Sequence, residues 1–383
     1  MLSLGKKIMI FDGGMGSELV KTGIPHRIPE DLNITHPDVI KEIHKSYADA
    51  DFITTNTFGL NKFKYKGDYA IPLVAQKAIE NARAAGKRVF FDIGPTGLLL
   101  KPFGTLDFDD AYEAFREVVL ASREATDGYI VETFSDLYEL KAALLAIKEN
   151  SDKPVFATMT FDKSGRTLTG TTPEIMVAFL EEVGVDALGV NCSLGPKELS
   201  GVVSRIIKAA HTPVIVQPNR GLPRLVDGVS VYDLSVEDFS ACAYEFAKMG
   251  VSVLGGCCGT SPSFISAIAK FKDMDVLPLK NPRLAAAISY SKYVEITADT
   301  KFESLVLDGS VTEDDAEDLA YEVLDLVDDG ADVVSLVPEG VTPATLKALI
   351  EKVQELSNMP LRLDCEDEDL QKCFKRYYNG VAG

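Results

Sequence analysis

The 383-residue sequence has no apolar run approaching the roughly 18–20 residues that a membrane-spanning helix requires. Its first residues hold only a short apolar stretch and no small-residue cleavage site, so no signal peptide is expected. Basic residues are also scarce, with 39 Lys and Arg against 58 Asp and Glu and a formal net charge of −19. Because a nucleic-acid-binding protein needs a basic footprint, we expect neither a nucleic-acid nor a membrane partner, and a cytoplasmic location.

Cysteine is scarce as well. Six cysteines in a chain of this length do not suggest a disulfide scaffold. Cys242 and Cys373 lie within helical patterns and are interpreted as small core residues. Cys192, Cys257 and Cys258 differ, because each lies near glycines at the end of a predicted strand.

Eight short, nearly continuous apolar runs recur through the first 258 residues, with amphipathic helical stretches between them. Runs of this kind are typical of parallel strands covered on both faces. They are KIMIFDGG from Lys7, DFITTNT from Asp51, RVFFDIG from Arg88, GYIVETF from Gly128, PVFATMTF from Pro154, DALGVNC from Asp186, PVIVQPN from Pro213 and SVLGGCC from Ser252. The pattern predicts a (β/α)8 TIM barrel over residues 1–280. A doubly wound open sheet is the alternative, but it normally carries its glycine-rich signature only after the first strand.

A linker near residues 270–284 separates this barrel from a smaller partial α/β unit over residues 285–383. That unit has about three β/α repeats, starting with YVEITAD, which are too few to close a barrel. It also holds 22 Asp and Glu against 8 Lys and Arg, which indicates a solvated acidic surface or a docking surface for a basic partner. Its apolar strands must be covered by the barrel, by a second copy of the chain or by another protein. We favour a homodimer through this unit.

The three strand-end cysteines predict a metal centre. On a barrel, Cys192 and the Cys257–Cys258 pair would both lie on the C-terminal face, where barrel active sites are built. Neighbouring side chains on a strand point to opposite faces, and we expect the backbone freedom of Gly255, Gly256 and Gly259 to turn both sulfurs inward. Three thiolates leave one position of a tetrahedral Zn²⁺ open, and this soft site favours a thiol substrate. Buried free cysteines and a vicinal disulfide are the alternatives.

Seven motifs in order give a family resemblance: DGGMGSEL, TTNTFG, DIGPTG, ETFSD, GVNCSLGP, QPNRGLP and GGCCGT. Together they resemble the homocysteine S-methyltransferase family over residues 5–270. The NTFG form is more similar to the homocysteine-binding module of cobalamin-dependent methionine synthase than to the other branches. The resemblance implies that Cys192, Cys257 and Cys258 are the zinc ligands.

Further candidate substrate contacts lie at other strand ends. Asp12 and Glu132 suit the α-ammonium group of homocysteine, and the family uses matching acids in this way. Backbone N–H groups of the glycine loop beginning at Gly13 and Gly14 are candidates for the substrate carboxylate. Polar contacts are also expected from Thr55, Asn56 and Asn191, for which structural turn roles are the alternative.

The C-terminal unit resembles the opening third of a pterin-binding barrel. However, ITADT at residues 296–300 and VVSLVP replace the Asn-bearing strand ends usual in that family, and the later strands are missing. Asp364 is the one matching polar residue. We therefore do not expect the unit to bind folate.

The leading functional hypothesis is zinc-dependent methyl transfer to homocysteine, giving methionine. No Asp-x-His-x-x-Gly cobalamin-binding motif occurs, so methylcobalamin would have to be supplied on a separate corrinoid protein. The alternatives are a stand-alone thiol methyltransferase that uses S-methylmethionine or another methyl-onium donor, and a non-catalytic zinc- or thiol-binding module.

Overall fold

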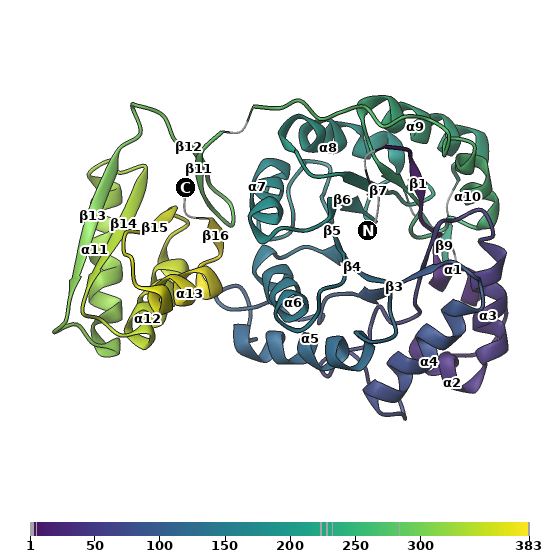
Figure 1. The fold of residues 1–383 in the computed structure, drawn as a ribbon, viewed down its shortest axis with the longest axis horizontal. Helices are drawn as coiled ribbons and strands as arrows, with labels where there is room; N and C mark the ends of the chain where they lie inside the picture. Colours follow the sequence, from purple (N-terminus) through teal and green to yellow (C-terminus); the bar gives the residue numbers. More distant parts are fainter. Residues whose placement is uncertain are drawn as a thin grey trace.

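The computed structural model describes residue 4 and residues 6–222, 224–226, 229–231, 233–282 and 284–381. Eight parallel strands form a ring surrounded by helices (Figure 1). They are β1 (Met9–Ile10), β2 (Phe52–Thr54), β3 (Arg88–Ile93), β4 (Gly128–Phe134), β5 (Val155–Met159), β6 (Ala187–Asn191), β7 (Val214–Gln217) and β10 (Val253–Leu254). A parallel bridge between Phe11 and Phe52 joins the first strand to the second. The predicted TIM barrel is confirmed.

The helices that cover the ring follow the strands in sequence. Several begin with proline in the first turn, where the missing N–H costs no helical hydrogen bond. The full set of helical segments of the barrel is α1 (Met15–Lys21), η1 (Pro29–Asp31), α2 (Leu32–Thr35), α3 (Pro37–Ser46), α4 (Ile71–Arg83), α5 (Phe108–Ser122), α6 (Leu137–Asn150), α7 (Pro173–Val183), α8 (Pro196–Ala209), α9 (Val236–Met249) and α10 (Pro262–Ala269). A short antiparallel pair, β8 (Arg224–Val226) and β9 (Val229–Val231), lies between β7 and α9.

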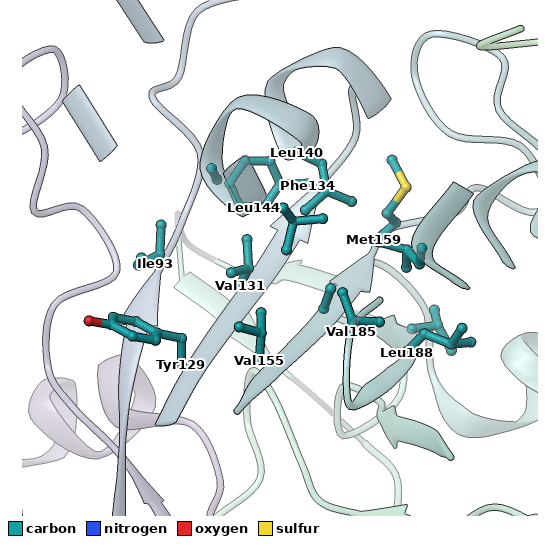
Figure 2. Packing of buried hydrophobic residues seen from close by; sticks show 14 of the residues in the cluster. Ile93, Tyr129, Val131, Phe134, Leu140, Leu144, Val155, Met159, Val185 and Leu188 are labelled. Atoms are coloured by element: carbon teal, nitrogen blue, oxygen red, sulfur yellow. The ribbon is translucent and has the colours of Figure 1, made fainter. Parts of the chain in front are cut away.

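Strand alternation divides the buried side chains of the barrel into two layers. One layer lies between the strands and helices, where Val131 and Phe134 of β4 lie beside Leu140 and Leu144 of α6 (Figure 2). The other fills the inside of the ring. Its members are fully buried and mostly large: Phe11, Phe52, Phe90, Ile130, Phe156, Ala187, Ile215 and Val253. The barrel centre is therefore a packed core, and a substrate can enter only at the ends of the strands.

The C-terminal unit contains two small sheets. Strands β13 (Phe302–Asp308), β14 (Val333–Glu339) and β15 (Leu361–Leu363) are parallel, with η2 (Glu313–Asp315), α11 (Ala316–Asp328), α12 (Pro343–Leu356) and α13 (Glu368–Tyr377). A second sheet is antiparallel, in the order β12 (Tyr293–Glu295), β11 (Ala286–Ser289) and β16 (Gly380–Val381). The expectation that YVEITAD opens the parallel series was therefore wrong, because Tyr293–Glu295 pairs antiparallel with the chain just before it.

This unit packs against the outside of the barrel. The Tyr138 hydroxyl of α6 donates to the carbonyl oxygen of Tyr377 at 2.8 Å. Asp109 of α5 forms ion pairs with Lys347 at 3.0 Å and Arg376 at 3.1 Å. Ile288 of β11 belongs to the same apolar cluster as the barrel core. The barrel is thus one of the three expected covering surfaces.

Part of the parallel sheet is left open. Leu305 and Leu307 of β13 face the helices, whereas Val306 between them is 53% exposed. A second copy of the chain over this face stays a prediction.

Among the described residues, no helix is long and apolar enough to cross a membrane.

A pH-dependent contribution to stability is expected from His44 of α3. Its side chain is fully buried, neither ring nitrogen has a hydrogen-bond partner among the described residues, and burial lowers its pKa from 6.5 to about 3. Between pH 6.5 and about 3 the His44 side chain is protonated in the unfolded chain but neutral in the folded chain. The free energy of unfolding is therefore highest above pH 6.5 and decreases as the pH falls. The contribution to the slope reaches about 1.4 kcal/mol per pH unit. Urea unfolding of His44→Leu between pH 4 and 6.5 should show a shallower slope than the wild type. The exposed His36 provides the control, because His36→Leu should keep the wild-type slope.

Candidate metal centre and substrate site

Three thiols meet at the C-terminal end of the barrel. Cys192 directly follows β6, and Cys257 and Cys258 lie in the loop after β10. Their sulfur atoms all lie within 4.8 Å of one another, and the Cys192 and Cys258 sulfurs are 3.9 Å apart. Within the described parts of the chain, this is the one group of three or more Cys, His, Asp or Glu side chains arranged to hold a metal ion. Three convergent sulfurs are a donor set suited to zinc.

The backbone turns the sulfurs inward by a different route from the one expected. Cys192 itself is left-handed, with φ at 58°, and so is Ser193 at 56°. In the loop between β10 and α10, Gly259 has a positive φ, at 80°, whereas Gly255 and Gly256 do not. Gly255 is needed for space instead, because a Cβ there would lie 2.9 Å from Phe11 Cβ. The energetic cost of turning Cys192 is thus borne by a non-glycine residue, as is common at functional sites.

Asn191 connects the thiols to the neighbouring strands. Its Oδ1 accepts hydrogen bonds from the Thr158 hydroxyl and the Thr133 backbone N–H, each at 2.9 Å. Its Nδ2 donates to the Thr133 hydroxyl at 2.8 Å and approaches the Cys257 sulfur at 3.9 Å. Thr133 has a φ of 66°, which is rare for a β-branched residue. Asn191 therefore supports a strained turn next to Glu132 and offers a donor to one of the sulfurs.

Polar side chains form a layer directly above the apolar interior. Side chains two residues apart share one face of a strand, so Asp92 follows Phe90 inward, Glu132 follows Ile130, and Gln217 follows Ile215. Strand alternation thus aims two acids at the mouth of the barrel, near the thiols. Asp12 follows Phe11 directly, at the end of the first strand.

The acids at the mouth hold their protons more tightly than usual. Burial, then the charges of Cys192 and Asp12, raises the pKa of Glu132 to about 8. Burial raises the pKa of Asp12 to about 7, although hydrogen bonds from Thr54 oppose the shift. Burial and the neighbouring Glu132 raise the pKa of Asp92 well above its usual range. Two buried acids, Asp12 and Asp92, and the half-buried Glu132 have little compensating charge, and they favour a cationic ligand.

The pKa of a clustered thiol is raised in the same way as the pKa values of the acids. Hydrogen bonds with Cys192 and Cys258, then burial, raise the pKa of Cys257 well above its usual range. A cation would reverse this effect by favouring the thiolates.

The remaining predicted residues are largely held by the protein itself. The two carboxylate oxygens of Asp12 accept from the Thr54 N–H and hydroxyl, both at 2.8 Å. Thr55 Oγ1 accepts from the Asp92 N–H at 3.0 Å, and Asn56 Nδ2 donates to the carbonyl oxygen of Pro29 at 2.8 Å. The Gly14 N–H donates to the carbonyl oxygen of Thr260 at 3.0 Å. These contacts position the loops of the mouth, and Glu132 has no such hydrogen bond among the described residues.

Sequence reasoning missed Asp92 and Gln217. Both are buried, and Asp92 Oδ1 and Gln217 Oε1 have no hydrogen-bond partner in the described structure. The signal was present, because each is a polar residue at the end of a barrel strand, as Glu132 is. Unpartnered oxygens at the mouth indicate that these two side chains contact a ligand or water.

The glycine loop after β1 must pass very close to the Cys257–Cys258 loop. A Cβ on Gly13 would lie 2.4 Å from the carbonyl oxygen of Thr260, whereas one on Gly16 would meet nothing within 4 Å. We expect Gly13→Ala to lower the free energy of unfolding by about 1–3 kcal/mol, because the two loops must separate. Gly16→Ala, in the first turn of α1, should instead raise it by about 0.5–1 kcal/mol. Urea unfolding of both variants checks this, and equal midpoints would contradict the close approach.

Comparisons with known proteins agree with this geometry. The family model described as homocysteine S-methyltransferase matches residues 9–271. Methionine synthase from Mycobacterium tuberculosis is 33% identical over 70% of this chain, and methionine synthase from Mycobacterium leprae is 30% identical over 94% of it. The chain spans only 25% and 34% of the length of these two relatives.

A solved structure shares the fold. The metallated form of the homocysteine methyltransferase MmuM from Escherichia coli covers 69% of this chain and 96% of its own length, with a TM-score of 0.60 and 21% identity. The match of the family model over most of the chain and the likeness to methionine synthase along nearly all of it show that the chain belongs to the homocysteine S-methyltransferase family.

Proposed function

We propose that this chain binds homocysteine at a zinc ion and presents its thiol to a methyl donor, so that methionine is formed. The observation that carries the proposal is the convergence of three cysteine sulfurs within 4.8 Å at the mouth of the barrel, beside buried acids. Membership of the family supplies the substrate class. A cytoplasmic location stays part of the same proposal.

The residues present fit zinc. Cys192, Cys257 and Cys258 supply three soft ligands and leave a fourth position for a substrate thiol. Bound there, zinc would keep that thiol ionised at neutral pH, where a free thiol with a pKa of about 8.5 is mostly protonated. The amide of Asn191 lies beside the Cys257 sulfur and helps to hold it in place.

The acids of the mouth bind and orient the amino acid. Glu132 is the primary candidate for the α-ammonium group, because Asp12 already accepts two hydrogen bonds from Thr54. A cationic group beside Glu132 lowers the pKa of its carboxyl and favours the charged ion pair. Asp12 adds negative charge next to it, while Thr55 and Asn56 fix the adjoining loop. The Gly13 N–H stays a candidate for the substrate carboxylate.

The methyl donor in this proposal is methylcobalamin carried by a separate corrinoid protein. The likeness to methionine synthases supports this choice over S-methylmethionine. Methionine formation should be measured from homocysteine with methylated corrinoid protein, free methylcobalamin or S-methylmethionine in turn. Activity with S-methylmethionine alone would reverse the assignment of the donor, and no activity with any of them would favour a non-catalytic thiol-binding module.

Zinc content tests the metal ligands. The wild-type chain should bind one zinc per chain, and the double variant Cys257→Ala/Cys258→Ala should bind none, since a single remaining thiolate cannot hold the ion. Cys242→Ala is the matched control, because Cys242 lies on α9 and is not among the clustered thiols. Elemental analysis after gel filtration, with circular dichroism to check folding, measures the outcome. Stoichiometric zinc in the double variant would remove these cysteines from the site.

Homocysteine kinetics test Glu132. Glu132→Gln removes the charge that faces the substrate ammonium, and one charge-assisted hydrogen bond is worth about 1.5–3 kcal/mol. The KM for homocysteine should therefore rise by about 10–150-fold, while zinc content stays at the wild-type level. Glu124→Gln changes an exposed acid of the same barrel and should leave the KM unchanged. If the KM of Glu132→Gln equals that of the wild type, Glu132 does not contact the substrate.

A further inference from the structure

A second cavity lies between the barrel and the C-terminal unit, away from the thiols. Its volume is about 520 Å³, within the range of small-molecule sites. Helices α6 and α7 form its barrel side, and β15, α13 and β16 form the other side. In Figure 1, α13 and β16 lie on the side of the C-terminal unit that faces α6 and α7. Cavities at such boundaries between units are frequent ligand sites.

The charge of this cavity is opposite to that of the chain. Lys141 and Lys148 line it from α6, and Arg362 and Lys375 line it from the C-terminal unit. Among the described lining residues, Glu182 is the single acid. The chain as a whole has 58 acids and 39 bases, and residues 285–383 have 22 acids and 8 bases. Two of those eight bases nevertheless line this cavity.

Among the described residues, the four cations have no acidic partners. Within the described parts of the chain, none of them lies within 4.0 Å of a carboxylate oxygen, although other residues of α6, α7 and α13 form ion pairs. Lys148 donates to the carbonyl oxygen of Gly184 at 2.5 Å. Neighbouring helices satisfy their cations with acids, so this local shortage of acids favours an anion supplied from outside.

Lys141 is the cation of the four whose charge is most unfavourable to bury. Its side chain is 4% exposed, and its ammonium group donates to the carbonyl oxygen of Tyr378. Burial lowers its pKa to about 7. A buried ammonium without a counter-charge is unfavourable, and a bound anion would offset that cost.

The other walls of the cavity are apolar. Phe179 and Val183 of α7 line one side, and Phe374 of α13 lines the other. A simple inorganic anion would leave these surfaces uncovered. An anion with an apolar body would cover them while its charged group contacts the cations.

We propose that the cavity between α6, α7 and α13 binds a small organic anion with an apolar body and a phosphate or carboxylate group. Arg362 and Lys148 contact the charged group from the two sides, and Lys141 closes the inner end. Because the ligand contacts both units, its binding holds the C-terminal unit against the barrel. The folded chain is thereby stabilised, and the stabilisation increases with the logarithm of the ligand concentration once this exceeds the Kd.

The fluorescent probe anilinonaphthalene sulfonate has the required chemistry, an apolar ring system with one oxyanion group. With the full-length chain we expect saturable binding of one probe per chain. Octyl phosphate or octanoate should displace it, and octanol, which has no charge, should not. The relative potency of the first two distinguishes a phosphate from a carboxylate ligand.

The double variant Lys148→Glu/Arg362→Glu should weaken probe binding by about ten-fold or more, the loss expected for one charge-assisted hydrogen bond. Lys77→Glu/Lys248→Glu is the matched control, because it makes the same change in net charge on the exposed faces of α4 and α9 and should keep wild-type affinity. Circular dichroism and melting curves establish that both variants fold. Absent probe binding, equal binding by the two double variants, or displacement by octanol at the concentration of octyl phosphate would overturn the proposal.

Discussion

The layer of aromatic rings inside the barrel is the constraint on which the rest of the structure depends. Phe52, Phe90 and Phe156 come from three different strands and Phe11 directly follows a fourth, and their ring centroids lie 4.8–5.9 Å apart. Such rings pack well only when the strands keep one register. Once that register is fixed, strand alternation sets which residues form the next layer. Asp92, Glu132 and Gln217 are brought to the mouth for this reason, two positions beyond the packed interior.

The mouth of the barrel, unlike its well-packed interior, contains several energetically unfavourable features. Thr133, Cys192 and Ser193 are left-handed although none is glycine, and burial raises the pKa of Asp12 and of Glu132. Asp92 Oδ1 and Gln217 Oε1 have no hydrogen-bond partner within the part of the chain that the structure describes. Each feature is unfavourable by itself, and the large core around it keeps the barrel folded. A zinc ion and a substrate with an ammonium group would relieve both electrostatic costs, since one favours thiolates and the other favours carboxylates. The same features that weaken the empty mouth thus favour the proposed ligands.

The C-terminal unit is held by a mixture of contacts typical of an interface between domains. Asp109 binds two cations from the unit, while Ile288 joins the barrel core. The acidic side chains of the unit lie mostly on exposed surfaces. Four of its eight cations lie on the barrel side: Lys347 and Arg376 pair with Asp109, and Arg362 and Lys375 line the cavity. This distribution leaves a positively charged cavity at the junction of a strongly acidic chain.

The sequence by itself determined the barrel, the order of its strands and the three cysteines, because a parallel barrel places consecutive strand ends on one rim whatever the side-chain details. It also singled out Glu132, since an acid near the end of the fourth predicted strand can face the mouth of the barrel. Tertiary structure decided what periodicity does not encode. The turn of Cys192 comes from its own left-handed backbone rather than from the glycines alone. Tyr293–Glu295 pairs antiparallel with β11, and this hydrogen bonding keeps it out of the parallel sheet. Asp92 lies close to Glu132 in the site, and the Asp12 carboxylate accepts hydrogen bonds from Thr54. Lys141 donates a hydrogen bond to Tyr378, more than two hundred positions away in the sequence. Such contacts depend on the packing of distant segments, which the local pattern of a sequence does not specify.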